Sequence, residues 1–230
     1  MFFLVIMASF SAVQPLFRSI TGDNPALELL IEFEQPYAFE AGIYLHGREE
    51  LYVTSLPIPD GAGNQRHVIS KIRLADSPVS SEVVVTDGLD MANGGTNYRD
   101  GMIFCAQGST ENPSGLFYMS PEAPNKTELL IKDFYGRPFN SLNDVVVQSD
   151  GSIWFTDPAY GYAEGYRPRP SLPNQVYRYD PASGSTRVMA DRLGHPNGLC
   201  FSPDEKILYV TDTDQVWGDG TIDLSRAATM

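Results

Sequence analysis

Residues 139–162 read F-N-S-L-N-D-V-V-V-Q-S-D-G-S-I-W-F-T-D-P-A-Y-G-Y and contain the strongest structural signal in the chain. The letters indicate a polar turn, a strand over 145–148, a turn at 149–151 and a second strand over 153–156. An Asp-Gly pair between β-branched and aromatic runs is typical of a β-hairpin. The sequence therefore predicts an antiparallel hairpin in this stretch.

The same order of polar turn, strand, turn and strand returns elsewhere in the chain. Residues 40–55 and 197–212 repeat it closely, and residues 97–106 form a weaker copy. The Gly- and Asn-rich residues 88–99 are predicted to form a long loop before that weaker copy. A repeat of roughly 50 residues built from short strands is typical of β-propeller blades. We therefore predict an all-β protein with about four blades of a propeller.

Polar residues open the three clear copies, namely Glu40, Asn143 and Asn197. In a propeller, residues at the start of the inner strands point into one central channel, so we expect these side chains to converge. One carboxylate with two amide oxygens suits Ca²⁺ or Mg²⁺ better than zinc or copper. The alternatives are turn formation by the two asparagines and an exposed strand-end carboxylate for Glu40.

Several segments resemble the gluconolactonase family, which also holds senescence marker protein and luciferin-regenerating enzyme. The nearest likeness is to fungal lactonohydrolases, and it extends from about residue 22 to residue 230. The resemblance implies a six-bladed propeller that holds a catalytic divalent metal, usually Ca²⁺, and hydrolyses lactones. The segments are E-A-G-I-Y (40–44), N-S-L-N-D-V-V (140–146), D-G-S-I-W-F-T-D-P-A-Y-G (150–161), P-N-Q-V-Y-R-Y-D (173–180) and P-N-G-L-C-F-S-P-D (196–204).

The resemblance assigns roles to single residues. Glu40, Asn143 and Asn197 would bind the metal, which is Ca²⁺ or another divalent cation such as Mg²⁺, Mn²⁺ or Zn²⁺. The metal would polarise the carbonyl of a small-molecule lactone and activate water. Asp144 follows Asn143 as it does in the family and is the candidate catalytic residue, with capping of the turn as an equal alternative.

Three further residues are candidates for substrate binding: Ser141, Tyr160 and Tyr162. Ser141 stands two positions before Asn143, where family members that act on sugar lactones carry an arginine, so selectivity for sugar acids is not expected. The loop over 160–174 is rich in Tyr, Gly, Pro and Arg. A loop of that length between strands is usually functional, and we expect it to form a wall of the pocket.

The resemblance also predicts a further metal-binding aspartate one repeat beyond Asn197, past residue 230. We therefore expect a truncated member with weak or absent activity, because fewer carboxylates bind Ca²⁺ less tightly. An open propeller edge would also favour self-association. The alternatives are a non-enzymatic propeller fragment and a phosphotriesterase-type hydrolase that uses the same metal site.

Composition sets the remaining expectations. The formal net charge of −13 and the lack of any basic run argue against nucleic acid as a partner. Residues 1–21 form an apolar segment, either a weak signal peptide or a lead strand, and residues 22–230 form the propeller. That segment is too short to span a membrane, and the sequence leaves cytoplasmic and secreted locations open. The two cysteines, Cys105 and Cys200, are expected to be buried free thiols.

Overall fold

The computed structural model describes residues 15–23, 25–61, 65–226 and 228–230. The chain divides into two compact units, residues 1–34 and 35–230. In the first unit, Pro15–Thr21 form helix α1 rather than a strand, and residues 1–14 of the apolar segment lie outside the described residues. Within the described part of the chain, no helix is long and apolar enough to cross a membrane.

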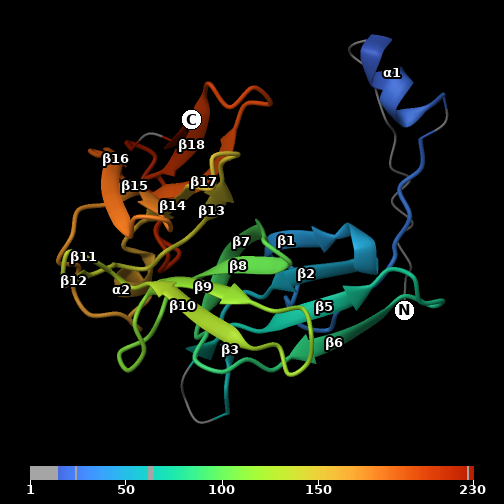
Figure 1. Cartoon of the computed structure of the whole chain (residues 1–230), viewed down its shortest axis with the longest axis horizontal. Helices are drawn as coiled ribbons and strands as arrows, with labels where there is room; N and C mark the ends of the chain where they lie inside the picture. The colour runs from blue at the N-terminus through green and yellow to red at the C-terminus, as the bar shows by residue number, and fades with distance from the viewer. Residues whose placement is uncertain (1–14, 24, 62–64, 227) are drawn as a thin grey trace. The chain divides into compact units, whose positions relative to one another are not determined.

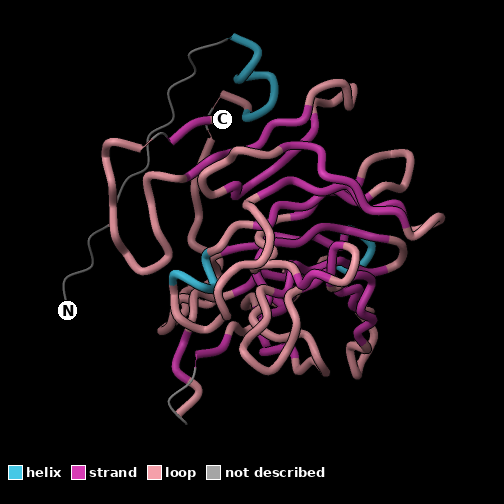
Figure 2. Tube along the Cα trace, turned by 90° about the vertical axis from the view of Figure 1, so that its left-hand side faces the viewer, coloured by secondary structure: helices cyan, strands magenta, loops and turns pink. Residues whose placement is uncertain are grey.

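The second unit is a β-propeller whose blades follow one another in chain order (Figure 1), as predicted. Strands and loops make up almost all of it (Figure 2). In the described residues, three blades have four antiparallel strands and the fourth has three. The blades are β1 (Glu40–Leu45), β2 (Glu50–Thr54), β5 (Ile69–Arg73) and β6 (Ser80–Val84); β7 (Ala92–Tyr98), β8 (Gly101–Ala106), β9 (Gly115–Met119) and β10 (Thr127–Ile131); β13 (Val145–Val147), β14 (Ile153–Asp157), β15 (Gln175–Asp180) and β16 (Ser185–Ala190); and β17 (Pro196–Phe201), β18 (Leu208–Thr213) and β19 (Ala228–Thr229).

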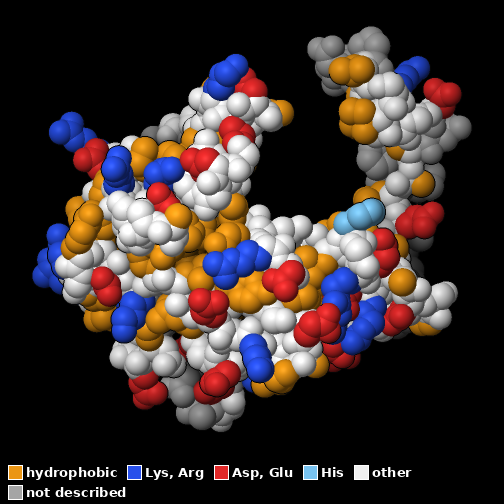
Figure 3. Space-filling model, in the orientation of Figure 1, with side chains coloured by type: hydrophobic (Ala, Val, Ile, Leu, Met, Phe, Trp, Pro, Cys, Tyr) orange, Lys and Arg blue, Asp and Glu red, His pale blue; other side chains and the backbone are white. Residues whose placement is uncertain are grey.

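Short elements connect these strands. They are the one-turn helix η1 (His46–Arg48), the helix α2 (Tyr160–Ala163), the two-stranded ribbon of β3 (Ile58–Pro59) with β4 (Gln65–Arg66), and that of β11 (Asp133–Phe134) with β12 (Arg137–Pro138). On the face of the second unit seen in Figure 3, acidic and basic side chains are interspersed with apolar ones.

The hairpin predicted from residues 139–162 is present as β13 and β14. Val145 pairs with Phe155 and Val147 with Ile153. Gly151 takes a φ of 85° in the turn, a conformation that glycine adopts without the cost of a Cβ. Both predicted strands are present, and they differ from the prediction by one residue at their C-terminal ends.

The core lies between neighbouring blades, and strand β8 contributes to both sides. All six residues of β8 are buried. Because side chains alternate across a strand, Met102 and Phe104 pack into the cluster shared with the first blade, whereas Ile103 and Cys105 pack into the cluster shared with the third. Cys105 is therefore a buried thiol, as predicted.

Cys200 is exposed, which contradicts the prediction of a buried thiol. Its neighbour Phe201 packs edge-on against Trp154 of the third blade, with ring centroids 5.5 Å apart. Alternation along β17 then directs Cys200 to the opposite face, beside Tyr209, its partner in the β17–β18 pairing. An apolar run alone did not reveal which side of the strand is covered.

The loop predicted over residues 88–99 is wrong, because residues 92–98 form the inner strand β7. A Cβ at Gly95 would lie 2.7 Å from the carbonyl oxygen of Ile103 and 2.8 Å from Cδ1 of Ile43. Glycine inside a strand often marks such a close approach of neighbouring chain. The residue that opens this blade is consequently Asn93, which lies earlier than the weaker copy at 97–106 suggested.

Candidate active site

The inner strands β1, β7, β13 and β17 lie beside one another in chain order. The pairing register shifts near the start of β1, between Ala41 and Ile43, and near the start of β17, between Pro196 and Leu199. Strand β7 has the same irregularity. Such bulges bend a strand and redirect its side chains, often beside functional sites.

One cavity of about 380 Å³ collects the residues that open the inner strands. The structure thus brings together Glu40, Asn143 and Asn197, and it adds Asn93 from the second blade. Glu40 and Asn197 are half-buried, whereas Asn93 and Asn143 are buried. The other lining residues are Phe39, Leu56, Gln107, Tyr160, Glu164, Thr213, Val216, Trp217, Gly218 and Gly220.

Hydrogen bonds between blades hold the backbone of these asparagines. The Thr156 hydroxyl donates to the carbonyl oxygen of Asn197 over 2.7 Å. The Gly94 N–H donates to the carbonyl oxygen of Asn143 over 2.8 Å. With their carbonyl oxygens occupied by neighbouring blades, both residues present their side chains to the cavity.

The amide oxygen of Asn143 is the least satisfied polar atom in this cavity. Asn143 is 4% exposed, and its Oδ1 is buried without a hydrogen-bond partner among the described residues. Leaving such an acceptor unpaired costs about 1–3 kcal/mol. At Asn197, the Nδ2 atom lies 3.5 Å from the Tyr160 hydroxyl and donates to it, which turns the amide oxygen away from the tyrosine. The amide oxygens of Asn143 and Asn197 could therefore both coordinate a cation in the cavity.

Two acidic groups near the cavity, Glu40 and Asp144, have raised pKa values. Burial raises the pKa of Glu40, and the negative charge of Asp144 raises it further. Burial also raises the pKa of Asp144, although the N–H groups of Leu199 and Val145 partly offset this. An opposite charge within a few ångströms would favour both carboxylates in their ionised form.

Asp144 itself joins two blades. Its Oδ1 accepts the N–H of Val145 at 2.8 Å, and its Oδ2 accepts the N–H of Leu199 at 3.0 Å. It lies beside the cavity rather than among the lining residues. This geometry accounts for a positioning role, and a catalytic role for Asp144 stays a prediction.

Glu164 is a lining residue that the sequence analysis missed. It follows helix α2, and burial raises its pKa to about 7, partly offset by a hydrogen bond with Tyr166. The Tyr166 hydroxyl donates its proton to Oε1 of Gln107 over 2.6 Å. No repeat position marks Glu164, because its place depends on how the loop after β14 folds back. Asn93 was detectable, since Asn93-Gly94 repeats the pair Asn197-Gly198.

The predicted substrate-binding residues have different surroundings. Ser141 is fully buried outside the cavity lining, where its hydroxyl donates to the carbonyl oxygen of Pro158 and accepts the N–H of Gly161. Tyr162 is 50% exposed and also lies outside the lining. Tyr160 lines the cavity, and its hydroxyl bonds to that of Thr213.

His195 packs against two aromatic residues that line the cavity, Tyr160 and Trp217. Its ring stacks on Tyr160 with centroids 5.0 Å apart and meets Trp217 edge-on at 4.8 Å. Nδ1 lies 3.2 Å from Oδ1 of Asp214, yet burial lowers the pKa of His195 and outweighs that acidic neighbour. The ring is 3% exposed and does not line the cavity. A packing role fits these contacts better than that of a general base.

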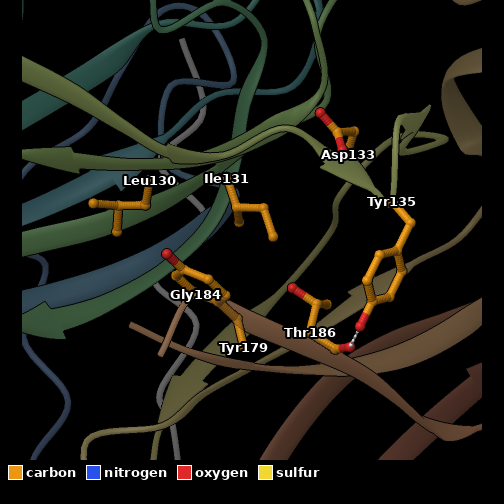
Figure 4. Close-up of a pocket in the computed structure, with 7 residues that line it drawn as sticks. All are labelled: Leu130, Ile131, Asp133, Tyr135, Tyr179, Gly184 and Thr186. Atoms are coloured by element: carbon orange, nitrogen blue, oxygen red, sulfur yellow. Dashed lines mark hydrogen bonds between the residues drawn. The ribbon is translucent and has the colours of Figure 1, made fainter. Parts of the chain in front are cut away.

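A second cavity, of about 300 Å³, lies between the outer strands of the second and third blades (Figure 4). The Tyr135 hydroxyl reaches the carbonyl oxygen of Thr186 at 3.5 Å across it. Its one carboxylate, Asp133, already accepts the N–H of Gly136. Across the described residues, no group of three or more His, Cys, Asp or Glu side chains is placed to hold a metal. A metal site in the first cavity would therefore depend on amide oxygens as well as Glu40.

Known proteins resemble this chain in sequence and in fold. Residues 72–217 match the family described as SMP-30/Gluconolactonase/LRE-like region. Lactonohydrolase oryL of Aspergillus oryzae is 32% identical over 207 residues, which cover 85% of this chain and 45% of that protein. A gluconolactonase of Zymomonas mobilis is 31% identical over 118 residues, covering 50% of this chain and 32% of the relative.

A solved structure agrees with these matches. The gluconolactonase of Xanthomonas campestris superposes with a TM-score of 0.61 and 28% identity, covering 82% of this chain and 58% of the other. The chain spans about half the length of the two Aspergillus oryzae relatives that it matches. The resemblance seen in the sequence is confirmed: with the matched region extending over more than half of its residues, the chain belongs to the SMP-30/Gluconolactonase/LRE-like family.

Proposed function

We propose that this protein is a divalent-metal-dependent hydrolase of lactones. The observation that carries the proposal is the buried, unpartnered Oδ1 of Asn143, which lines the same cavity as Glu40 and Asn197. The names of the relatives, lactonohydrolase and gluconolactonase, point to a small lactone as the substrate.

Ca²⁺ is the ion that best suits these donors, because it prefers several uncharged and charged oxygen ligands. Glu40, Asn143 and Asn197 would hold it, with Asn93 as a further amide in reach of the cavity. When bound, the ion supplies Lewis-acid polarisation of the lactone carbonyl. Mg²⁺, Mn²⁺ and Zn²⁺ are the alternatives, and smaller or softer ions fit an amide-rich set less well.

The side chains around this site perform the remaining tasks. Glu40 offers negative charge at the cavity. Asp144 bonds to its neighbour Val145 and to Leu199 of the next blade, and these bonds fix the segment from which Asn143 extends. Glu164, with a pKa of about 7, can give or take a proton at neutral pH. We propose Glu164, in addition to Asp144, as a candidate for proton transfer to or from water.

Lactone hydrolysis measured by acid release tests this proposal. We expect turnover of glucono-δ-lactone or γ-butyrolactone that chelation abolishes and Ca²⁺ restores, together with a large loss in the Asn143→Ala variant. Asn112→Ala, at an exposed position outside the cavity, is the matched control. The expectation of weak activity stays a prediction, so the assay needs high protein concentrations. Turnover that is indifferent to chelation, or no turnover together with no Ca²⁺ binding, would contradict the proposal.

A further inference from the structure

The cavity has an extensive apolar lining in addition to its amide and carboxylate groups. Phe39 and Leu56 come from the first blade, Tyr160 from helix α2, and Val216 and Trp217 from the loop after β18. Ligand pockets usually combine such apolar walls with a few polar groups that fix orientation. The proposed metal site accounts for the polar groups, whereas no role has yet been assigned to the apolar residues.

Trp217 is the largest of these residues, and two neighbouring side chains contact its ring. It meets the His195 ring edge-on at 4.8 Å, and the Arg226 guanidinium lies 5.4 Å from the centre of its ring. Its backbone N–H donates to the carbonyl oxygen of Thr221 over 2.9 Å. A rigid aromatic side chain loses little conformational entropy when a ligand packs against it.

The charges around the cavity favour an uncharged ligand. Its charged lining residues, within the part of the chain that the structure describes, are Glu40 and Glu164, with no lysine or arginine among them. Arg226 lies against Trp217, and its Nε atom is 3.0 Å from Oδ2 of Asp214. The proposed Ca²⁺ would be bound by Glu40 and the amides, whereas the Glu164 carboxyl lies beside Gly218, next to Trp217. A negative substituent packed against Trp217 would therefore face Glu164 with no lysine or arginine in the described lining, which disfavours binding.

We propose that this cavity selects lactones that carry an uncharged aromatic or aliphatic substituent, with Trp217 as the residue that determines this specificity. The inference rests on the proposed function in one respect, that the ligand is a lactone. The amide and carboxylate groups would face the lactone ring, and the substituent would pack on Trp217 and Tyr160. Lactones substituted with a carboxylate or phosphate would be poor ligands.

Three γ-lactones that differ at one position provide a matched set. They are γ-butyrolactone, γ-phenyl-γ-butyrolactone and 5-oxotetrahydrofuran-2-carboxylate. We expect the phenyl compound to have the highest kcat/KM and the carboxylate compound the lowest. The Trp217→Ala variant should lose about 10- to 100-fold in kcat/KM for the phenyl compound and clearly less for γ-butyrolactone, which has no substituent to pack on the ring. Trp217→Phe should recover most of the loss, and Tyr135→Ala, at a 79% exposed aromatic residue outside the cavity, should lose nothing.

A binding measurement keeps the inference testable where turnover is slow. The chain has 2 tryptophans, so Trp154→Phe leaves Trp217 as the one tryptophan fluorophore. We expect saturable quenching of this fluorescence by the phenyl lactone, at concentrations at least tenfold below those needed for the other two compounds.

The outcomes separate the two proposals. Binding of the phenyl lactone on Trp217 with neither hydrolysis of any lactone nor binding of Ca²⁺ would overturn the proposed function and support the selectivity. Hydrolysis of all three lactones at similar rates, equal losses for both neutral lactones in Trp217→Ala, or no preferential quenching would overturn the selectivity and leave the proposed function standing.

Discussion

Gly94 shows how a single residue sets the geometry of the site. A Cβ at this position would lie 2.5 Å from Oδ1 of Asp144 and 2.6 Å from the carbonyl oxygen of Asn143. The Asn143 carbonyl oxygen accepts the N–H of Gly94, and the Asp144 carboxylate accepts the N–H groups of Val145 and Leu199, so neither group can move away without breaking a hydrogen bond.

Gly94→Ala is therefore expected to destabilise the protein by about 1–3 kcal/mol, the usual cost of overpacking. The midpoint of urea unfolding measures this. Gly47→Ala is the matched control, because no atom lies within 4 Å of the Cβ it would add. A midpoint for Gly94→Ala equal to that of the control would show that β7 and Asn143 are not in close contact.

The raised pKa of Glu164 predicts that the stability of the fold depends on pH. Its pKa rises from 4.5 to about 7 in the folded protein because of burial. A carboxyl group with a raised pKa stabilises the fold fully below its unfolded pKa, and that contribution is lost as the pH rises through the folded pKa. Stability should thus fall between pH 4.5 and about pH 7.

The Glu164→Gln variant should lack this part of the pH profile, because its amide does not ionise. Thermal unfolding of both proteins across that pH range provides the comparison, with the exposed Glu111→Gln as control. Parallel profiles for wild type and Glu164→Gln would show that Glu164 is not buried in the folded chain.

At the scale of the elements, threonines at the ends of second strands join the blades. Thr54 in β2 donates to the carbonyl oxygen of Asn93 over 3.0 Å, and Thr156 in β14 does the same to Asn197 over 2.7 Å. The Thr156 hydroxyl also accepts the N–H of Asp144. These two threonines thus fasten one blade to the next.

Thr156→Val removes a donor and an acceptor at this joint with little change of shape. We expect a loss of about 1–3 kcal/mol in unfolding free energy, since buried groups are left unpaired, together with weaker Ca²⁺ binding through displacement of Asn197. Calorimetric Ca²⁺ titration and urea unfolding measure the two effects. Thr110→Val, at an exposed position, is the control and should change neither quantity. Unaltered Ca²⁺ affinity in Thr156→Val would show that the Thr156 hydrogen bonds do not position Asn197 for Ca²⁺ binding.

The elements also show what local sequence can predict. The hairpin of β13 and β14 was found from its turn and its alternating residues, because both signals act within a few positions. Strand β7 was missed, because Gly94 and Gly95 are favoured there by contacts with other strands rather than by local propensity. Packing between blades decided that element, and such packing leaves little trace in a single segment.

At the scale of the whole molecule, the repeat predicted which residues converge but not what surrounds them. Glu40, Asn143 and Asn197 share one cavity because each opens an inner strand. Glu164 and Trp217 reach that cavity from irregular loops, whose paths depend on tertiary contacts. Sequence spacing therefore predicted the candidate ligands, whereas the apolar wall and the group with a raised pKa needed the structure.

Thermal unfolding of the chain with Ca²⁺ and with chelator tests the central claim most directly. A ligand that binds the folded state stabilises it by RT ln(1 + [L]/Kd), about 2.7 kcal/mol at a hundredfold excess over Kd. We predict a Tm that rises with Ca²⁺ concentration in the wild type and in Asn112→Ala, and no rise in Asn143→Ala. Equal Tm values with Ca²⁺ and with chelator, or a rise that survives in Asn143→Ala, would contradict a metal site built on Glu40, Asn143 and Asn197.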